Sequence, residues 1–300
     1  EMCIRDSFQI AEFLKKRGVK VGLVTNGTTM TDELAGRCVS SGIDSFQVSL
    51  LSDERDVHND LAGCDCFDRT IEGICHLRKR NATVCTYFVG TARNISTFRR
   101  TLELNVLLGV RNVALGRFVP GGTALNGWEE LLPAPAMLQE ALDAAEEVTK
   151  KYPIAVSVST PILPCLVDLS KYDRIAPGFC AVGNSGASIF AIDPLGHLKV
   201  CTHSPVLLGN LFEVSFEEAA RHPFVTEFLE TLPEYCRDCP MASDCRGGCR
   251  SSAHLCDGSF LAEDPYLKVW KSSADKTAPS LRKLKERAPR EPAAGSAARE

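Results

Sequence analysis

The sequence lacks three features that would place the protein in common classes. No apolar run approaches the roughly 20 residues of a membrane-spanning helix, so we expect no membrane segment. We see no secretory signal pattern and therefore expect a reducing, cytoplasmic compartment. The net charge is −4 and no basic stripe is present, which argues against a nucleic-acid partner. With 44% hydrophobic residues in 300, the chain can bury a large core, and we expect two domains.

Cysteine, in contrast, is plentiful and ordered. From Cys180 onward, fifteen residues precede Gly196, four more precede Cys201, and the run Cys236-x2-Cys239-x5-Cys245-x3-Cys249 follows, with Cys256 soon after. Iron–sulfur clusters are held by cysteine thiolates, and short loops that supply several of them keep the sulfurs at ligating distances. Seven such residues are nearly enough for two cubane clusters, so this half of the chain is predicted to bind iron and sulfide.

This pattern resembles the SPASM/twitch region of radical S-adenosylmethionine (SAM) enzymes, whose signature is C-x(9–15)-G-x4-C, a gap, C-x2-C-x5-C-x3-C, a gap and a last cysteine. The resemblance covers about 176–262 and implies two auxiliary [4Fe-4S] clusters. Cluster I would take Cys180, Cys201 and Cys249, whereas cluster II would take four further residues, Cys236, Cys239, Cys245 and Cys256. Family members with full ligation have one more cysteine where this chain has Gly186, which implies that cluster I has an open iron or a ligand from elsewhere. Cys165 is one donor to consider, but a buried or incidental thiol is the favoured interpretation of that residue.

Two other uses of these cysteines remain open. A zinc ribbon could use four of them, Cys236, Cys239, Cys245 and Cys249, because zinc favours tetrahedral thiolate sites. That interpretation leaves Cys180, Cys201 and Cys256 without a role. A disulfide framework is disfavoured by the expected reducing compartment and by a chain long enough for a proper core.

The first half repeats a strand followed by a helix. Apolar runs predict strands, and helical periodicity predicts the segments between them; the strands are 20–25, 45–50, 83–89 and 111–118, and the helices 31–41, 67–80, 96–108 and 134–150. Short strands, apolar on both faces and alternating with helices, imply parallel β-α-β units in a doubly wound sheet or a (β/α) barrel. In both arrangements functional residues lie at the carboxyl ends of the strands.

Those strand ends resemble the radical SAM barrel, which implies an α/β fold: a partial (β/α)6, TIM-like barrel followed by a small cysteine-rich SPASM domain with a β-hairpin and short helices. The Thr25-Asn26-Gly27 turn and Ser49 correspond to barrel positions that face SAM. By this resemblance Thr25, Asn26 and Ser49 are assigned to the SAM pocket, with Asn94 and Arg117 as further candidates. For Arg117, a solvated or paired surface charge is the alternative.

Two family segments are missing from the 300 residues. The C-x3-C-x2-C motif that holds the SAM-binding cluster does not occur, and neither does the G-G-E-P segment. We therefore expect a truncated barrel that begins near its third strand and is inactive as given. Residues 1–7 (EMCIRDS) are expected to be a non-native leader, 8–160 the partial barrel, 161–175 a linker, 176–262 the SPASM domain, and 263–300 a polar, disordered tail.

The resemblance implies an oxidoreductase or maturase. In the intact enzyme a third cluster and SAM would generate a 5′-deoxyadenosyl radical that removes hydrogen from a peptide or protein, with an electron donor such as flavodoxin or ferredoxin. Sulfatase-maturing members have an aspartate where this chain has Thr202, which argues against sulfatase maturation as the function. The alternatives are a haem-pathway radical SAM enzyme and a non-catalytic module that binds zinc or a degenerate cluster.

Overall fold

The structure is a computed structural model that describes residues 6–176, 178–180, 182 and 190–274. The chain forms two compact units. The first unit comprises Glu1–Phe118 and Ala136–Ser159, and the second comprises Val119–Pro135 and Thr160–Glu300. The switch after Ser159 lies beside the predicted end of the barrel at 160, but the segment 119–135, which we expected in the barrel, is grouped with the second unit.

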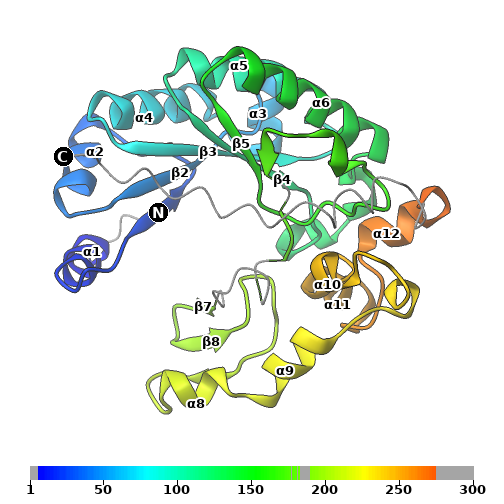
Figure 1. Cartoon of the computed structure of the whole chain (residues 1–300). Coiled ribbons are helices and arrows are strands. Elements are labelled where there is room, and N and C mark those ends of the chain that lie inside the picture. The colour runs from blue at the N-terminus through cyan, green and yellow to red at the C-terminus, as the bar shows by residue number, and fades with distance from the viewer. Residues whose placement is uncertain (1–5, 177, 181, 183–189, 275–300) are drawn as a thin grey trace. The chain divides into compact units, whose positions relative to one another are not determined.

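Five parallel strands of a six-stranded sheet lie in the first unit (Figure 1). They are β1 (Gly22–Thr25), β2 (Ser45–Ser49), β3 (Thr83–Gly90), β4 (Asn112–Arg117) and β5 (Ala155–Val158). Each pairs in parallel with the next, in chain order. The α/β prediction is confirmed, because a parallel sheet requires a crossover between each pair of strands. Strand β5 was not predicted, since its four residues are too short to show a pattern.

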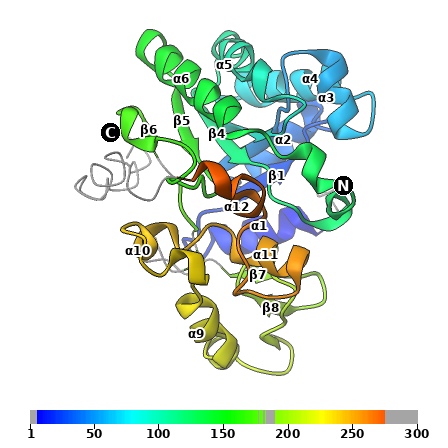
Figure 2. The same ribbon diagram turned by 90° about the vertical axis from the view of Figure 1, so that its right-hand side faces the viewer.

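One helix precedes β1, and the others connect the strands (Figure 2). They are α1 (Ser7–Lys15), α2 (Asp32–Ser40), α3 (Arg55–Ala62), α4 (Phe67–Lys79), α5 (Phe98–Leu107) and α6 (Pro135–Lys151). The start of α2 shows why the sequence folds this way locally. The Thr31 side chain accepts a hydrogen bond from the Leu34 amide, and Asp32 and Glu33 occupy the first turn, where a negative charge stabilises the helix dipole.

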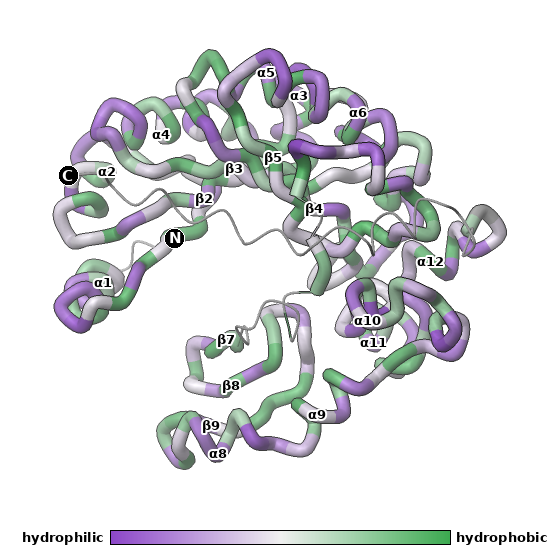
Figure 3. The backbone as a smooth tube through the Cα atoms, viewed as in Figure 1, coloured by the Kyte–Doolittle hydropathy of each residue, from purple (hydrophilic) through white to green (hydrophobic). Residues whose placement is uncertain are grey.

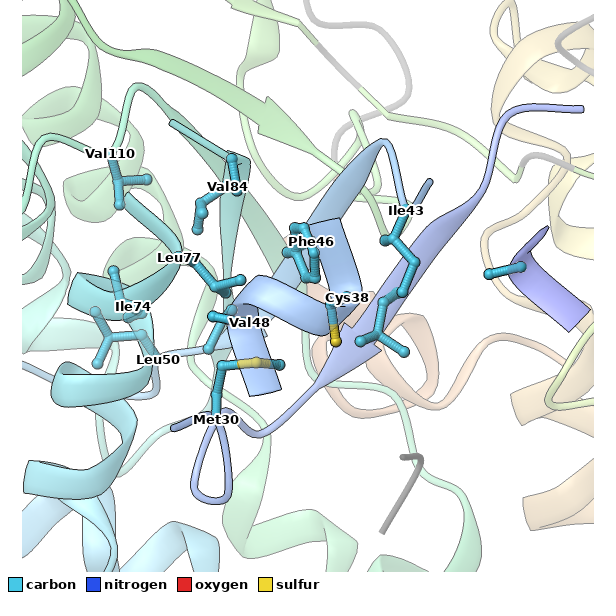
Figure 4. Packing of buried hydrophobic residues seen from close by; sticks show 14 residues of the cluster. Met30, Cys38, Ile43, Phe46, Val48, Leu50, Ile74, Leu77, Val84 and Val110 are labelled. Carbon is cyan, nitrogen blue, oxygen red and sulfur yellow. The ribbon is translucent and has the colours of Figure 1, made fainter. Parts of the chain in front are cut away.

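The sheet has one buried face and one half-exposed face. Residues that alternate along β2 and β3, such as Phe46, Val48 and Val84, are buried in a cluster with Ile74 and Leu77 of α4 (Figure 4). The residues between them, including Gln47 and Tyr87, are only partly buried. The expectation that the strands are apolar on both faces is therefore wrong for β2 and β3, because helices cover one face and the other carries polar side chains.

The second unit has shorter elements around its own core. They are the strands β6 (Ile175–Ala176), β7 (Ala191–Ile192), β8 (His197–Lys199) and β9 (Gly209–Asn210), and the helices α8 (Phe216–Ala220), α9 (Pro223–Glu230), α10 (Ala242–Cys245), α11 (Arg250–Asp257) and α12 (Pro265–Trp270). Strands β7, β8 and β9 form an antiparallel sheet. Leu198, Phe224 and Phe228 are buried beside it, and the tube of this unit alternates between apolar and polar residues (Figure 3).

The predicted hairpin is present in part. Its turn is closed by the Asp193 amide, which donates to the His197 carbonyl at 3.0 Å, and Gly196 has φ of +88°, a conformation that favours glycine. In the predicted first strand, 188–192, only Ser188 and Ile189 lie outside the described residues, as does Gly186. Only Ala191 and Ile192 of that segment are seen as β7.

Both predicted chain ends can be compared with the structure only in part. Residues 1–5 and 275–300 lie outside the described residues. Helix α1 already includes Ser7, and α12 lies inside the segment expected to be a disordered tail. That expectation is wrong for α12, because Tyr266 and Leu267 are buried and Asp264 caps the helix. Among the described residues, no helix combines the length and the apolar character needed to cross a membrane.

Candidate cofactor and cluster sites

The Thr25-Asn26-Gly27 turn is held by its own side chains and by α4. The Gly27 amide donates to Thr25 Oγ1 at 3.1 Å, and the Thr28 amide donates to Asn26 Oδ1 at 3.1 Å. From α4, the Thr70 hydroxyl donates to the Asn26 carbonyl at 3.0 Å. Asn26 is exposed and Thr25 is half-buried, so both remain available at the end of β1.

Glycine at position 73 lets α4 approach this turn. A Cβ atom on Gly73 would lie 2.3 Å from the Gly27 carbonyl oxygen, which is well inside contact distance. Gly27 itself has φ of +77°, where a side chain would strain the backbone. The turn therefore depends on two glycines, one within it and one on the helix behind it.

Ser49 and Tyr87 are neighbours on the half-exposed face of the sheet. The two residues are paired in the register of β2 and β3. The Ser159 hydroxyl donates to Tyr87 Oη at 2.9 Å, and a Cβ on Gly116 would lie 2.2 Å from the same oxygen. Sequence reasoning missed Tyr87. The sequence did contain a signal for it. Tyr87 has an aromatic hydroxyl and lies close to the end of a predicted strand, and residues at the ends of the neighbouring strands were already assigned to the SAM pocket.

Asn94 is fully buried and has four protein partners. Its Oδ1 accepts hydrogen bonds from the Thr91 amide at 2.7 Å and the Thr91 hydroxyl at 2.9 Å. Its Nδ2 donates to the carbonyls of Leu51 at 2.7 Å and Val89 at 2.9 Å. These bonds join the segments that follow β2 and β3, so Asn94 fixes the strand ends. Contact between Asn94 and SAM stays a prediction.

Arg117 lies at the end of β4 and is only 1% exposed. It is paired in register with Gly90 of β3, and one of its guanidinium nitrogens donates to the Phe118 carbonyl at 3.4 Å. The alternative of a surface charge is therefore wrong. A buried guanidinium at a strand end supplies a fixed positive charge, as binding of an anionic group requires.

In the second unit, three predicted cluster ligands line one cavity. Its walls include Cys236, Cys239 and Cys245, and also Cys165 and Tyr235. Burial raises the pKa of the Cys245 thiol to about 12, and Cys165 and Cys236 are among the charged neighbours that act in the same direction. A bound metal would displace that proton, since thiolates and not thiols are the ligands.

The loop geometry explains how these cysteines come together. Cys236 ends a short 3₁₀ helix, η5 (Glu234–Cys236), and its carbonyl accepts from the Cys239 amide at 3.1 Å. Cys245 ends α10 and is followed by Gly247 and Gly248, which both have positive φ. A Cβ on Gly247 would lie 3.2 Å from Cys236 Sγ. The two glycines thus let the chain turn back over the cavity.

The predicted cluster I ligands occupy another neighbourhood of the same unit. Burial raises the pKa of Cys180, and the charge of the Cys201 thiolate raises it further. Cys201 Sγ lies 3.3 Å from the hydroxyl of Ser251, which is two residues beyond Cys249. Cys249 is the N-cap of α11, where its sulfur accepts from the Ser252 amide at 3.5 Å.

Cys256 is not among the described residues that line the cavity of cluster II. It is in the last turn of α11, and burial raises the pKa of its thiol to about 11. The nearby carboxylates Asp257, Asp264 and Glu129 raise this pKa further, whereas Lys268 lowers it.

A buried arginine carries positive charge into this region. Arg250 is 2% exposed and donates to the carbonyls of Phe260 at 3.1 Å and Ala262 at 2.6 Å. Burial lowers its pKa, whereas Asp264 and three cysteines, Cys236, Cys249 and Cys245, raise it. The guanidinium can therefore compensate the negative charge of thiolates in both neighbourhoods.

The donor set in this unit suits an iron–sulfur cluster by its chemistry. Cysteine thiolates hold such clusters, and three of the predicted ligands, Cys236, Cys239 and Cys245, line one cavity. Within the ranges that the structure describes, no group of three or more His, Cys, Asp or Glu side chains is arranged to hold one metal ion.

Comparison with known proteins adds independent information. No protein-family model matches the chain. A curated sequence relative, the AdoMet-dependent heme synthase of Methanosarcina barkeri, is 27% identical over 279 residues, which cover 87% of this chain and 78% of that protein.

Two solved structures share the fold. Native anSMEcpe with bound AdoMet has a TM-score of 0.66 at 15% identity, with 93% of this chain and 79% of that chain covered. Streptococcus suis SuiB also has a TM-score of 0.66, at 13% identity, with 87% of this chain and 63% of that chain covered. The chain is thus similar in sequence to an AdoMet-dependent heme synthase, and it shares its fold with anSMEcpe and SuiB.

Proposed function

We propose that the protein is an oxidoreductase or maturase that binds SAM in the first unit and two auxiliary [4Fe-4S] clusters in the second. The observation that carries this proposal is the cavity lined by Cys236, Cys239 and Cys245. The same unit contains two further predicted ligands, Cys180 and Cys201. A binding module without redox chemistry has no need of so many thiols. SAM and a reduced cluster would supply a 5′-deoxyadenosyl radical for hydrogen abstraction, with auxiliary clusters able to accept the remaining electron.

The residues of the first unit would bind and orient SAM. Thr25, Asn26 and Ser49 present a hydroxyl, an amide and a hydroxyl at the ends of adjacent strands, and these groups suit the polar methionyl and ribose parts of SAM. Asn94 would keep those strand ends in place, as its four hydrogen bonds allow. Arg117 would supply the buried positive charge for a carboxylate.

We propose a peptide or protein as the substrate. Two kinds of solved structure with this fold contain one: anSMEcpe with the Kp18Cys peptide, at a TM-score of 0.67, and SuiB with its precursor peptide SuiA, at 0.65. A reductant protein such as flavodoxin or ferredoxin would supply the first electron.

A second candidate is haem formation. It is favoured by the relationship to the heme synthase of Methanosarcina barkeri, which extends over most of both chains. The same clusters and SAM site would serve both reactions, so the substrate alone separates the two candidates.

The test uses the frame of the native locus, with whatever coding sequence adjoins Glu1. The protein is reconstituted anaerobically, supplied with SAM and reductant, and incubated with peptides encoded beside the gene or with a haem precursor. SAM cleavage together with a mass change in a peptide supports maturation, whereas haem absorbance supports the second candidate. Stoichiometric zinc without sulfide would contradict both.

A further inference from the structure

The sequence pattern assigns four ligands to cluster II, but the cavity contains a different fourth cysteine. Cys165 lines it together with Cys236, Cys239 and Cys245. Cys165 therefore shares one cavity wall with Tyr235 and with the three other cysteines.

Cys256, the ligand that the pattern supplies, does not share these neighbours. It is absent from the described residues that line the cavity. Its helix, α11, presents Cys249 at its first turn and Cys256 at its last.

We propose that Cys165 is the fourth thiolate of the iron–sulfur cluster held by Cys236, Cys239 and Cys245, in the position that the sequence pattern gives to Cys256. The inference deepens the proposed function, on which it rests, by naming a ligand of one auxiliary cluster. Each of the four thiols loses one proton on binding an iron, and no electron is transferred in that step.

The local structure suits this role. The amides of Leu166 and Val167 both donate to the Leu163 carbonyl, at 3.0 and 3.1 Å, so Cys165 lies in a closed turn. Leu163 is 1% exposed and anchors the turn in the core. A cluster ligand held in this way loses little conformational freedom on binding, which favours affinity.

The charge around the cavity also suits an anionic cluster. Arg250 is buried, and one of its guanidinium nitrogens donates to the carbonyl of Gly247, a residue of the cavity wall. Its Nε atom is buried and has no hydrogen-bond partner within the described part of the chain, although the other two nitrogens are bonded to carbonyls. A sulfur of the cluster or of its thiolates would satisfy that donor.

The experiment compares three variants of the full chain after anaerobic reconstitution: Cys165→Ala, Cys256→Ala and, as a matched control, Cys85→Ala in β3 of the first unit. Iron and sulfide are counted per chain, and EPR spectra are recorded after mild oxidation. Cys165→Ala should lose at least about one iron per chain and show a three-iron cluster signal. Cys256→Ala and Cys85→Ala should retain the wild-type iron content and spectrum.

A second variant guards against misfolding. If Cys165→Ala does not fold by circular dichroism, Cys165→Ser decides, because its hydroxyl keeps the volume and changes the donor atom. An altered EPR spectrum for Cys165→Ser supports the inference. A wild-type spectrum for Cys165→Ser, or iron loss in Cys256→Ala with an intact Cys165→Ala, overturns it.

The two proposals fail in different ways. A wild-type chain that takes up no iron and sulfide, or that holds zinc alone, overturns the proposed function and the inference together. A wild-type chain that holds clusters, with Cys165 variants identical to it, overturns the inference alone.

Discussion

The two candidate sites differ in what keeps them in place before any ligand binds. At the strand ends of the first unit, Asn94 and the Thr25-Asn26-Gly27 turn already have hydrogen bonds within the protein. In the second unit, cysteines gather in a buried cavity where burial raises the pKa of Cys245, with the charge of Arg250 beside them. The first of these regions is thus held by hydrogen bonds within the protein, whereas in the proposed cluster site metal would replace the thiol protons.

Removal of Arg250 should have the largest effect. Arg250→Met removes a buried positive charge that interacts with the buried Asp264, so the free energy of unfolding of the second unit should fall by about 3–5 kcal/mol. Both tryptophans, Trp128 and Trp270, belong to this unit, so their fluorescence during urea unfolding reports on it. The exposed Arg237→Met is the control and should change stability by less than about 0.5 kcal/mol. Equal values for the two variants would contradict the role of Arg250.

Truncation of Asn94 should have an intermediate effect on the first unit. Asn94→Ala leaves buried partners of four hydrogen bonds unsatisfied, so we expect a loss of about 2–3 kcal/mol in the absence of SAM. Hydrogen exchange of peptides that span β2 and β3 measures it. Asn112→Ala, with an exposed side chain at the start of β4, should leave exchange unchanged. If Asn94→Ala weakens SAM binding without faster exchange, Asn94 is a ligand and not a positioning residue.

The smallest expected effect is a pH dependence in the first unit. His58 is 2% exposed, its Nδ1 accepts from the Leu51 amide at 3.2 Å, and burial lowers its pKa. The unfolded chain therefore binds a proton below about pH 6.5 before the folded chain does. Stability from this group is present above that pH and is lost as the pH falls, by at most about 1.4 kcal/mol per pH unit.

His58→Gln should flatten that slope. The measurement is the unfolding of the first unit, followed by far-UV circular dichroism or hydrogen exchange at several pH values between 5 and 7. A variant with the wild-type slope would show that another group binds the proton.

Periodicity in the sequence predicted the repeating strands and helices of the first unit because each has an apolar face that recurs at a regular interval. Helix α3 was missed for the opposite reason. Its buried residue is His58, so its inward side is polar and gives no apolar pattern. Strand β5 was missed because four residues contain too few alternations.

For the candidate sites, spacing in the sequence could indicate which cysteines share a loop but not which distant cysteine joins them. Cys236, Cys239 and Cys245 lie within ten residues, and one chain reversal brings them to the same cavity. Cys165 reaches that cavity only through the tertiary fold, about seventy residues away in the chain. The burial of Arg117 was likewise invisible, since a charged residue after a strand is usually exposed.

The contact between α4 and the Thr25-Asn26-Gly27 turn has a mechanical consequence. The Thr70 hydroxyl donates a hydrogen bond to the Asn26 carbonyl. The backbone of Gly73 lies so close to the Gly27 carbonyl that a side chain at position 73 would not fit. The turn cannot shift toward the helix without a backbone collision, and it cannot shift away without breaking the bond to Thr70. We therefore expect the helix and the turn to move together, so that a change in the tilt of α4 shifts the Thr25 and Asn26 side chains as well.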